Sequence, residues 1–276
     1  MLSGIDHIVV LVRDLESATA GYEALGFTVT PGGEHAGGAT HNTLIGFEDG
    51  TYFELIAFKD PSKTHDHRWW ARLAKGEGLV DYALRAENAE AVVDEARSRG
   101  LELAAPVDGS RRRPDGELIA WRSITSGRPI GTSSLPFAIE DVTSREARVP
   151  GGSAAKHRLG VTGVAELVIA VRDIHVASRD LETMLGQKPE SIEARAEGHG
   201  GEALFTTGGH RLRLVEPDGT TVDGASISEH LEARGEGPYE VVLQLENGQA
   251  TGKLLPLTET NGARIRVWAI RGQPHQ

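Results

Sequence analysis

Apolar and β-branched residues open the chain in a strand-like run that ends at Arg13 and Asp14. An aspartate at this place is well suited to cap a helix, and a helix-like stretch follows as far as Leu25 and Gly26. Turn residues then separate three further apolar runs that are predicted to be strands, at 27–30, 40–47 and 51–58. The predicted order of one strand, one helix and three strands makes one βαβββ unit.

The same unit recurs along the chain. Residues 4–15 align without a gap to residues 163–174, with Arg-Asp at the same place, and the next helix-like stretch again ends in Leu-Gly, at Leu185 and Gly186. Another unit lies between these two copies, with a helix predicted over 89–99. Its strands are predicted at 79–85, 101–104, 117–124 and 134–141.

The last part of the chain holds a complete third unit, at 161–216, and a shortened fourth one. In the fourth unit, strands are predicted at 239–245 and 263–270, but the segment between them is too short and too rich in glycine for a helix. An irregular stretch around Pro150-Gly151-Gly152-Ser153 is interpreted as a linker. The predicted division is a first domain at 1–145, a linker at 146–160 and a second, degenerate domain at 161–276.

Composition and charge narrow the classes of function. The net charge of -11 disfavours nucleic acid and anionic membranes as partners. The absence of cysteine excludes disulfides, thiolate metal sites and cysteine nucleophiles, so any metal must bind to His, Asp or Glu. The N-terminal apolar run is shorter than the core of a signal peptide, and a cytoplasmic location is therefore expected.

Several motifs resemble the vicinal oxygen chelate superfamily, and within it the glyoxalase-like domain family. The motifs are Asp6-His7-Ile8-Val9, GGATHNTLIG at 37–46, GTYFELIA at 50–57, RPDGELIAWR at 113–122 and Leu135-Pro136-Phe137. The resemblance implies an α+β fold in which paired βαβββ modules form open, cup-shaped sheets with helices outside. It also implies a small oxygenated substrate that chelates a divalent metal inside the cup, as in glyoxalases, extradiol dioxygenases and related lyases and isomerases. Metal-free binding proteins share the fold.

Carried over onto this chain, the resemblance implies a metal bound by His7 on the first strand and Glu54 on the fourth. In the second module the position of His7 is taken by Asp81, and Glu140 on the closing strand is the expected third ligand, with His41 or Asp81 as an additional polar group. An imidazole and carboxylates suit Fe, Mn, Ni or Zn. His7 and Glu54 are also the expected catalytic residues.

Two alternatives to the metal site remain open. In a metal-free enzyme, Glu54 would remove a proton next to a carbonyl while His7 or an arginine holds the oxyanion. In a protein that only binds or sequesters a small molecule, His7 would be a buried, hydrogen-bonded histidine and Glu54 a solvated carboxylate. The favoured function is a metal-dependent isomerase or lyase, with ring-cleaving dioxygenation ranked lower because no second histidine is visible. Either a monomer or a homodimer is compatible with four modules in one chain.

Several further residues are candidates for the substrate pocket, and others are interpreted as structural. Arg113 and Arg122 flank a predicted hairpin turn and are expected to bind a substrate oxygen, with Trp121 and His41 as further pocket residues, whereas Arg111 is interpreted as solvated. The run His65-Asp66-His67 lies where a loop at 61–64 is predicted to lead into a helix at 66–74, and it is not interpreted as a metal site because residues two apart do not share a helix face. In the second half, Glu166 and Arg213 take the places of His7 and Glu54, which predicts an ion pair and a structural cup.

Overall fold

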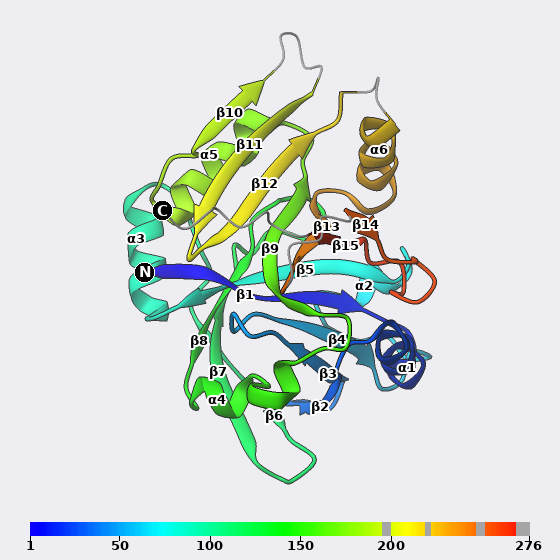
Figure 1. Cartoon of the computed structure of the whole chain (residues 1–276). Coiled ribbons are helices and arrows are strands. Elements are labelled where there is room, and N and C mark those ends of the chain that lie inside the picture. The colour runs from blue at the N-terminus through cyan, green and yellow to red at the C-terminus, as the bar shows by residue number, and fades with distance from the viewer. Residues whose placement is uncertain (195–199, 219–221, 247–251, 269–276) are drawn as a thin grey trace, which may run out of the picture.

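The computed structural model describes residues 1–194, 200–218, 222–246 and 252–268. Two β-sheets organise the chain: the first half forms a closed eight-stranded barrel, and the second half an open seven-stranded sheet (Figure 1). Helices α1 and α3 lie outside the barrel, and α5 covers one face of the second sheet. The α+β class and the tandem βαβββ modules predicted from the sequence are confirmed.

The first module has the predicted order of elements. These are β1 (Leu2–Leu11), α1 (Leu15–Leu25), β2 (Thr30–His35), β3 (Thr40–Gly46) and β4 (Tyr52–Phe58). Asp14 caps α1 by accepting a hydrogen bond from the backbone N–H of Ser17, and Gly26 ends the helix with φ 99°. The pattern of local signals therefore sets both ends of this helix.

The second module repeats this order after a short helix, α2 (Trp70–Leu73). Its elements are β5 (Gly78–Ala86), α3 (Ala89–Ser98), β6 (Val107–Arg112), β7 (Leu118–Ile124) and β8 (Phe137–Asp141). The strand predicted at 101–104 is wrong: Leu101 and Leu103 are buried under the helix without pairing to a strand, and β6 begins further on. An apolar run signals burial, but the neighbouring strands decide which residues pair.

The barrel closes because the two modules pair with each other at two seams. Its strand order is β1-β4-β3-β2-β6-β7-β8-β5, and β1 is antiparallel to β5. At the other seam, β2 pairs with β6, with Glu34 opposite Arg112 and His35 opposite Arg111. The β2–β6 seam turns the expected open cup into a closed barrel.

The second half contains one complete module and one shortened module. The third module comprises β9 (Val161–Ala170), α5 (Ile174–Leu185), β10 (Ser191–Ala194), β11 (Gly201–Thr207) and β12 (His210–Glu216). After α6 (Val222–Arg234) come β13 (Gly237–Leu245), β14 (Lys253–Leu254) and β15 (Ile265–Trp268). The strand predicted at 263–270 corresponds to β15, although residues 269 and 270 lie outside the described part. The sheet order, β10-β11-β12-β9-β13-β15-β14, repeats the barrel's pattern with the last module incomplete.

The two halves share one apolar core, which includes Ile8 and Leu84 of the barrel and Leu167 and Val241 of the second sheet. Polar contacts join them as well: the hydroxyl of Tyr22 donates to the carbonyl oxygen of Thr260 at 3.1 Å. None of the helices in the described residues has the length and apolar character needed to cross a bilayer.

The segment predicted to be a linker is packed against the barrel rather than free. It contains α4 (Arg145–Arg148), which begins one residue before the predicted boundary, and the 3-10 helix η1 (Gly152–Ala155). His157 contacts the carbonyl oxygen of Gly46 at 2.9 Å, and Arg148 is 2% exposed inside the barrel. This segment therefore completes the barrel's interior.

Candidate functional site

A cavity of about 260 Å³ lies inside the barrel. Its apolar lining comprises Leu44, Ile56, Trp69, Trp121, Phe137 and Ile139. Its polar lining includes His7, His35, Asn42, Tyr52, Glu54, His67, Arg68, Arg111 and Arg148. A concave pocket that combines apolar walls with convergent polar groups is the usual form of a small-molecule site, and this cavity has both.

His7 and Glu54 meet at this cavity because their strands are parallel neighbours. Val9 of β1 lies opposite Glu54 of β4, so His7 and Glu54 point to the same side of the sheet two residues apart. The Nε2 atom of His7 lies 3.5 Å from Oε2 of Glu54. The structure thus brings these two predicted site residues together.

A second imidazole reaches Glu54 from β2. The Nε2 atom of His35 lies 3.3 Å from Oε1 of Glu54, and its Nδ1 lies 2.9 Å from the hydroxyl oxygen of Thr40. The side chain of Asn42 donates to the same Glu54 oxygen at 2.6 Å. His35 and Asn42 were not predicted as site residues, and their inward position depends on the β2–β6 seam and on the parity of β3.

Behind the cavity, a buried ion network holds His7. A bulge between Ile5 and His7 interrupts the pairing of β1 with β5, and bulges of this kind redirect side chains. The Nδ1 atom of His7 lies 2.7 Å from Oδ1 of Asp6, whose carboxylate accepts two hydrogen bonds from Arg148, at 2.9 and 2.8 Å. Because Asp6 engages Nδ1, the other ring nitrogen, Nε2, faces the cavity.

Aromatic rings fix the plane of the His7 imidazole. The ring of Tyr52 stacks on it with centroids 4.6 Å apart and an interplanar angle of 17°, and Phe137 meets it edge-on. The hydroxyl of Tyr52 accepts a hydrogen bond from Arg148 at 2.7 Å. Packing and hydrogen bonds therefore leave His7 little freedom to rotate.

Electrostatics keep the two buried carboxylates ionised. Burial by itself raises the pKa of Asp6, but Arg148 and the hydrogen bond from His7 outweigh it and hold this pKa well below its usual range. Burial opposes ionisation of Glu54 too, yet His35, His7 and Asn42 lower its pKa to about 2. A carboxylate this acidic is a weak general base at neutral pH but a good anionic ligand.

His67, from the run 65–67 that was not interpreted as a functional site, lines the same cavity. Burial, with a contribution from His35, lowers the pKa of His67 to about 4, so its ring is neutral at neutral pH. The backbone N–H of Trp69 donates to its Nδ1 at 3.3 Å, which leaves the proton on Nε2. His67 is thus a neutral hydrogen-bond donor at the cavity.

Of three other residues named from the sequence, Trp121 and Asp81 lie at or beside the cavity, whereas His41 does not. Trp121 lines the cavity and meets His35 edge-on. Asp81 is buried beside it, accepting from the indole N–H of Trp69 at 2.9 Å. His41 lies outside the lining, next in sequence to the inward Asn42.

Glu140, Arg113 and Arg122 are not brought to the cavity. Glu140 accepts from the backbone N–H of Ala89 at the start of α3 and lies 3.5 Å from Arg122, which also pairs with Glu90. Arg113 is in the hairpin turn and pairs with Asp115 and Glu117. The expected ligand Glu140 is therefore replaced in the cluster by His35, because β8 presents Phe137 and Ile139 to the interior.

The chemistry of the donor set fits a divalent metal. His7, His35 and Glu54 offer two imidazole nitrogens and a carboxylate, a set that binds first-row transition metals. Both imidazoles have Nδ1 engaged by a polar neighbour, Asp6 or Thr40, as metal-bound histidines usually do. The two imidazoles contact different oxygens of Glu54 and do not converge on one point. Accordingly, no group of three or more His, Asp or Glu side chains among the described residues already has the geometry of a metal centre.

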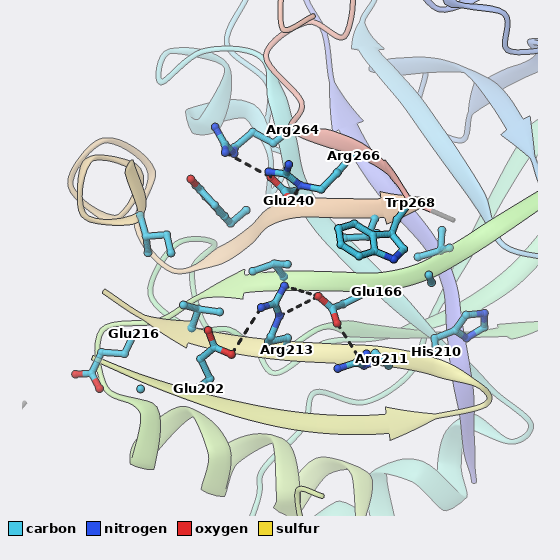
Figure 2. A pocket seen from close by; sticks show the side chains of 18 of the residues that line it. Glu166, Glu202, His210, Arg211, Arg213, Glu216, Glu240, Arg264, Arg266 and Trp268 are labelled. Carbon is cyan, nitrogen blue, oxygen red and sulfur yellow. Dashed lines mark hydrogen bonds and ion pairs between the residues drawn. The ribbon is translucent and has the colours of Figure 1, made fainter. Parts of the chain in front are cut away.

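The second sheet has a cup of its own, a hollow of about 1210 Å³ on the face opposite α5 (Figure 2). In the barrel, Val9 of β1 lies opposite Glu54 of β4 and Asp81 of β5. In the second sheet, Val168 of β9 holds the corresponding position, opposite Arg213 of β12 and Glu240 of β13. The positions of His7, Glu54 and Asp81 are therefore taken by Glu166, Arg213 and Glu240.

These charges in the second cup neutralise one another. The Nε atom of Arg213 donates to Glu166 at 2.8 Å, and Arg266 donates two hydrogen bonds to Glu240, at 2.6 and 3.0 Å. The predicted ion pair between Glu166 and Arg213 is present. Glutamates held by arginines offer no site for a divalent cation.

Comparisons with known proteins give the family and the fold. A family profile described as "Glyoxalase-like domain" matches residues 5–185. A search of curated proteins finds no significant match. A hypothetical protein from Staphylococcus aureus is similar in structure, with a TM-score of 0.69 and 14% identity, over 96% of this chain and 99% of that one.

Two enzymes are also among the similar structures. A variant of 4-hydroxymandelate synthase from Streptomyces coelicolor has a TM-score of 0.61 and 17% identity, over 89% of this chain and 72% of that one. A fusion of a xylose isomerase-like TIM barrel with 4-hydroxyphenylpyruvate dioxygenase has a TM-score of 0.53 and 14% identity, over 90% of this chain and 37% of that one. These likenesses show a vicinal oxygen chelate fold, and because the profile spans well over half of the chain, the protein belongs to the glyoxalase-like domain family.

Proposed function

We propose that the barrel cavity is the active site of a metal-dependent enzyme that acts on a small oxygenated substrate. The observation that carries this proposal is the cluster of His7, His35 and Glu54, in which both imidazoles are oriented from behind and turn Nε2 towards one ionised carboxylate. The favoured reaction is proton transfer next to a carbonyl, of the isomerase or lyase type. A divalent metal held by these three residues would polarise the substrate oxygens.

The protein's own groups have distinct tasks in this proposal. Asp6 and Tyr52 hold the ring of His7, and Asn42 holds Glu54. The Nε2–H of His67 is suited to donate to an oxygen that gains negative charge during the reaction. The apolar walls limit contact of these groups with water and so strengthen their interactions.

Oxygenation is a second candidate, and His35 is the observation that favours it. The sequence offered one histidine, whereas the cavity brings together two histidines and a carboxylate, the set that non-haem iron oxygenases use. Two of the similar structures carry the names of a hydroxymandelate synthase and a dioxygenase, which is consistent with this alternative. Oxygen consumption with a turned-over substrate would separate oxygenation from proton transfer.

Metal content tests the proposal. Purified protein exposed to Mn, Fe, Ni and Zn and freed of loosely bound ions is expected to retain about one metal per chain. His7→Ala, His35→Ala and Glu54→Gln are each expected to weaken metal binding by at least ~100-fold, because each removes a ligand or its charge. Elemental analysis and metal titration measure the effect.

Two matched carboxylate variants serve as controls. Glu140→Gln, outside the cavity, and Glu166→Gln, in the second cup, are expected to keep the metal. Failure of the wild type to retain any of the four metals would contradict the metal-dependent proposal and favour a metal-free binding protein. Equal metal content in all variants would place the metal elsewhere.

A further inference from the structure

We propose that the barrel cavity selects a substrate bearing a carboxylate, and that Arg111 binds this group. The inference rests on the proposed function only in taking the barrel cavity as the substrate site. The substrate class follows from the positive charge of Arg111, which is buried beside the cavity and has no acidic partner among the described residues.

The environment of Arg111 differs from that of the other arginines at the cavity. Arg148 pairs with Asp6 and Asp141, and Arg68 pairs with Asp81. Arg111 is 4% exposed, and within the described residues no carboxylate lies at ion-pair distance from it. Glu54 lines the same cavity and acts on Arg111 only through space.

The hydrogen bonds of Arg111 are incomplete too. Its Nη2 donates to the carbonyl oxygen of Arg148 at 2.7 Å, while its buried Nε has no partner. Burial lowers the pKa of Arg111, but a guanidinium remains protonated at neutral pH. A buried charge without a counter-ion is costly, so its position beside a cavity points to an anionic ligand.

Arg111 lies within β6 and lines the cavity, whereas Arg113 lies beyond the end of that strand, and Arg122 points to the opposite face of β7 from Trp121. On β6, residues 108–111 all line the cavity, and Gly109 leaves room for the indole of Trp121 on β7. Arg72 is also buried without an acidic partner among the described residues, but it donates to the carbonyl oxygen of Arg234 between the two halves and lines neither cavity.

The remaining walls define the rest of the ligand. Trp69, Trp121 and Phe137 favour an apolar, planar body. A cavity of about 260 Å³ holds roughly nine water-sized groups, at ~30 Å³ each. The inferred class is a small carboxylic acid with an apolar body and a further oxygen directed towards His7 and Glu54.

Binding of small carboxylates to the full chain, stripped of metal with a chelator, tests this inference. The probes are benzoate and phenylacetate, each compared with its neutral amide, benzamide or phenylacetamide, by isothermal titration calorimetry. The wild type is expected to bind the acids at least ~10-fold more tightly than the amides. Arg111→Met is expected to lose about 10- to 100-fold in affinity for the acids and little for the amides.

Control variants guard against a folding artefact. Arg113→Met removes an exposed cation near the same hairpin and is expected to keep the preference for acids. Arg111→Lys retains the positive charge but loses the planar guanidinium and its two parallel donors, so its affinity for the acids is expected to be ~10-fold below that of the wild type. This variant tests the inference even if Arg111→Met does not fold. Unchanged acid affinity in Arg111→Lys, or no preference for acids in the wild type, would overturn the inference. Because metal is absent, the result is independent of the metal proposal.

Discussion

Replacing Arg148 by methionine is expected to lower the free energy of unfolding by about 3 kcal/mol, because it leaves Asp6 and Asp141 short of their main counter-ion inside the protein. For a chain of this size, the midpoint of thermal unfolding should fall by roughly 6–12 °C. Differential scanning calorimetry and urea titration measure both quantities. The same variant frees the hydroxyl of Tyr52, so loss of order around His7 is also expected.

An exposed arginine provides the control for Arg148. Arg113→Met breaks two ion pairs in the hairpin turn, where solvent screens the charges, and is expected to change stability by less than about 0.5 kcal/mol. A stability of Arg148→Met within that same margin would show that the buried network does not stabilise the fold.

The stabilisation by Asp6 should depend on pH in a defined direction. Its pKa in the folded chain is held below the unfolded value of about 3.9, so its contribution is present above that pH and is lost as the pH falls through the folded pKa. The difference in unfolding free energy between wild type and Asp6→Asn is therefore expected to be constant between about pH 5 and 8 and to narrow below about pH 4. A difference that narrows near neutral pH would contradict this assignment.

Substituting Gly33 by alanine is expected to cost about 3 kcal/mol and to loosen the seam that closes the barrel. Gly33 has φ 131°, and a Cβ atom there would overlap the carbonyl oxygen of Arg112 on β6. Because His35 and Arg111 come from the two strands of this seam, the cavity should open. Urea titration measures the stability, and hydrogen exchange at Ala36, whose N–H donates to Ser110, measures the opening.

Gly38 offers a matched comparison. It also has a positive φ, of 69°, but no atom lies within 4 Å of a Cβ built on it, so Gly38→Ala should cost only about 1 kcal/mol and leave the seam closed. Equal effects of the two substitutions would mean that backbone conformation alone, and not the close approach of β6, demands glycine at position 33.

Local patterns in the sequence determined much of this fold. Asp14 and Gly26 set the ends of α1, the gap-free repeat of residues 4–15 at 163–174 revealed the modules, and alternation on β1 and β4 brought His7 and Glu54 to one face. These features depend on neighbours close in the chain or on the two-residue period of a strand, and a sequence displays both directly.

Only the tertiary structure decided which residues complete the site. His35 and Arg111 became neighbours through the β2–β6 seam, and Arg148 entered the barrel from a segment whose composition suggested a linker. Glu140 was misplaced because the parity of β8 depends on its register with β5, which the sequence does not fix. For His35, Arg111 and Glu140 the physical reason is that pairing between distant strands sets which side chains face inward, and no local signal encodes that pairing. Arg148 lies on α4 and is held inside by Asp6 and Asp141, contacts between residues far apart in the chain that the sequence does not display either.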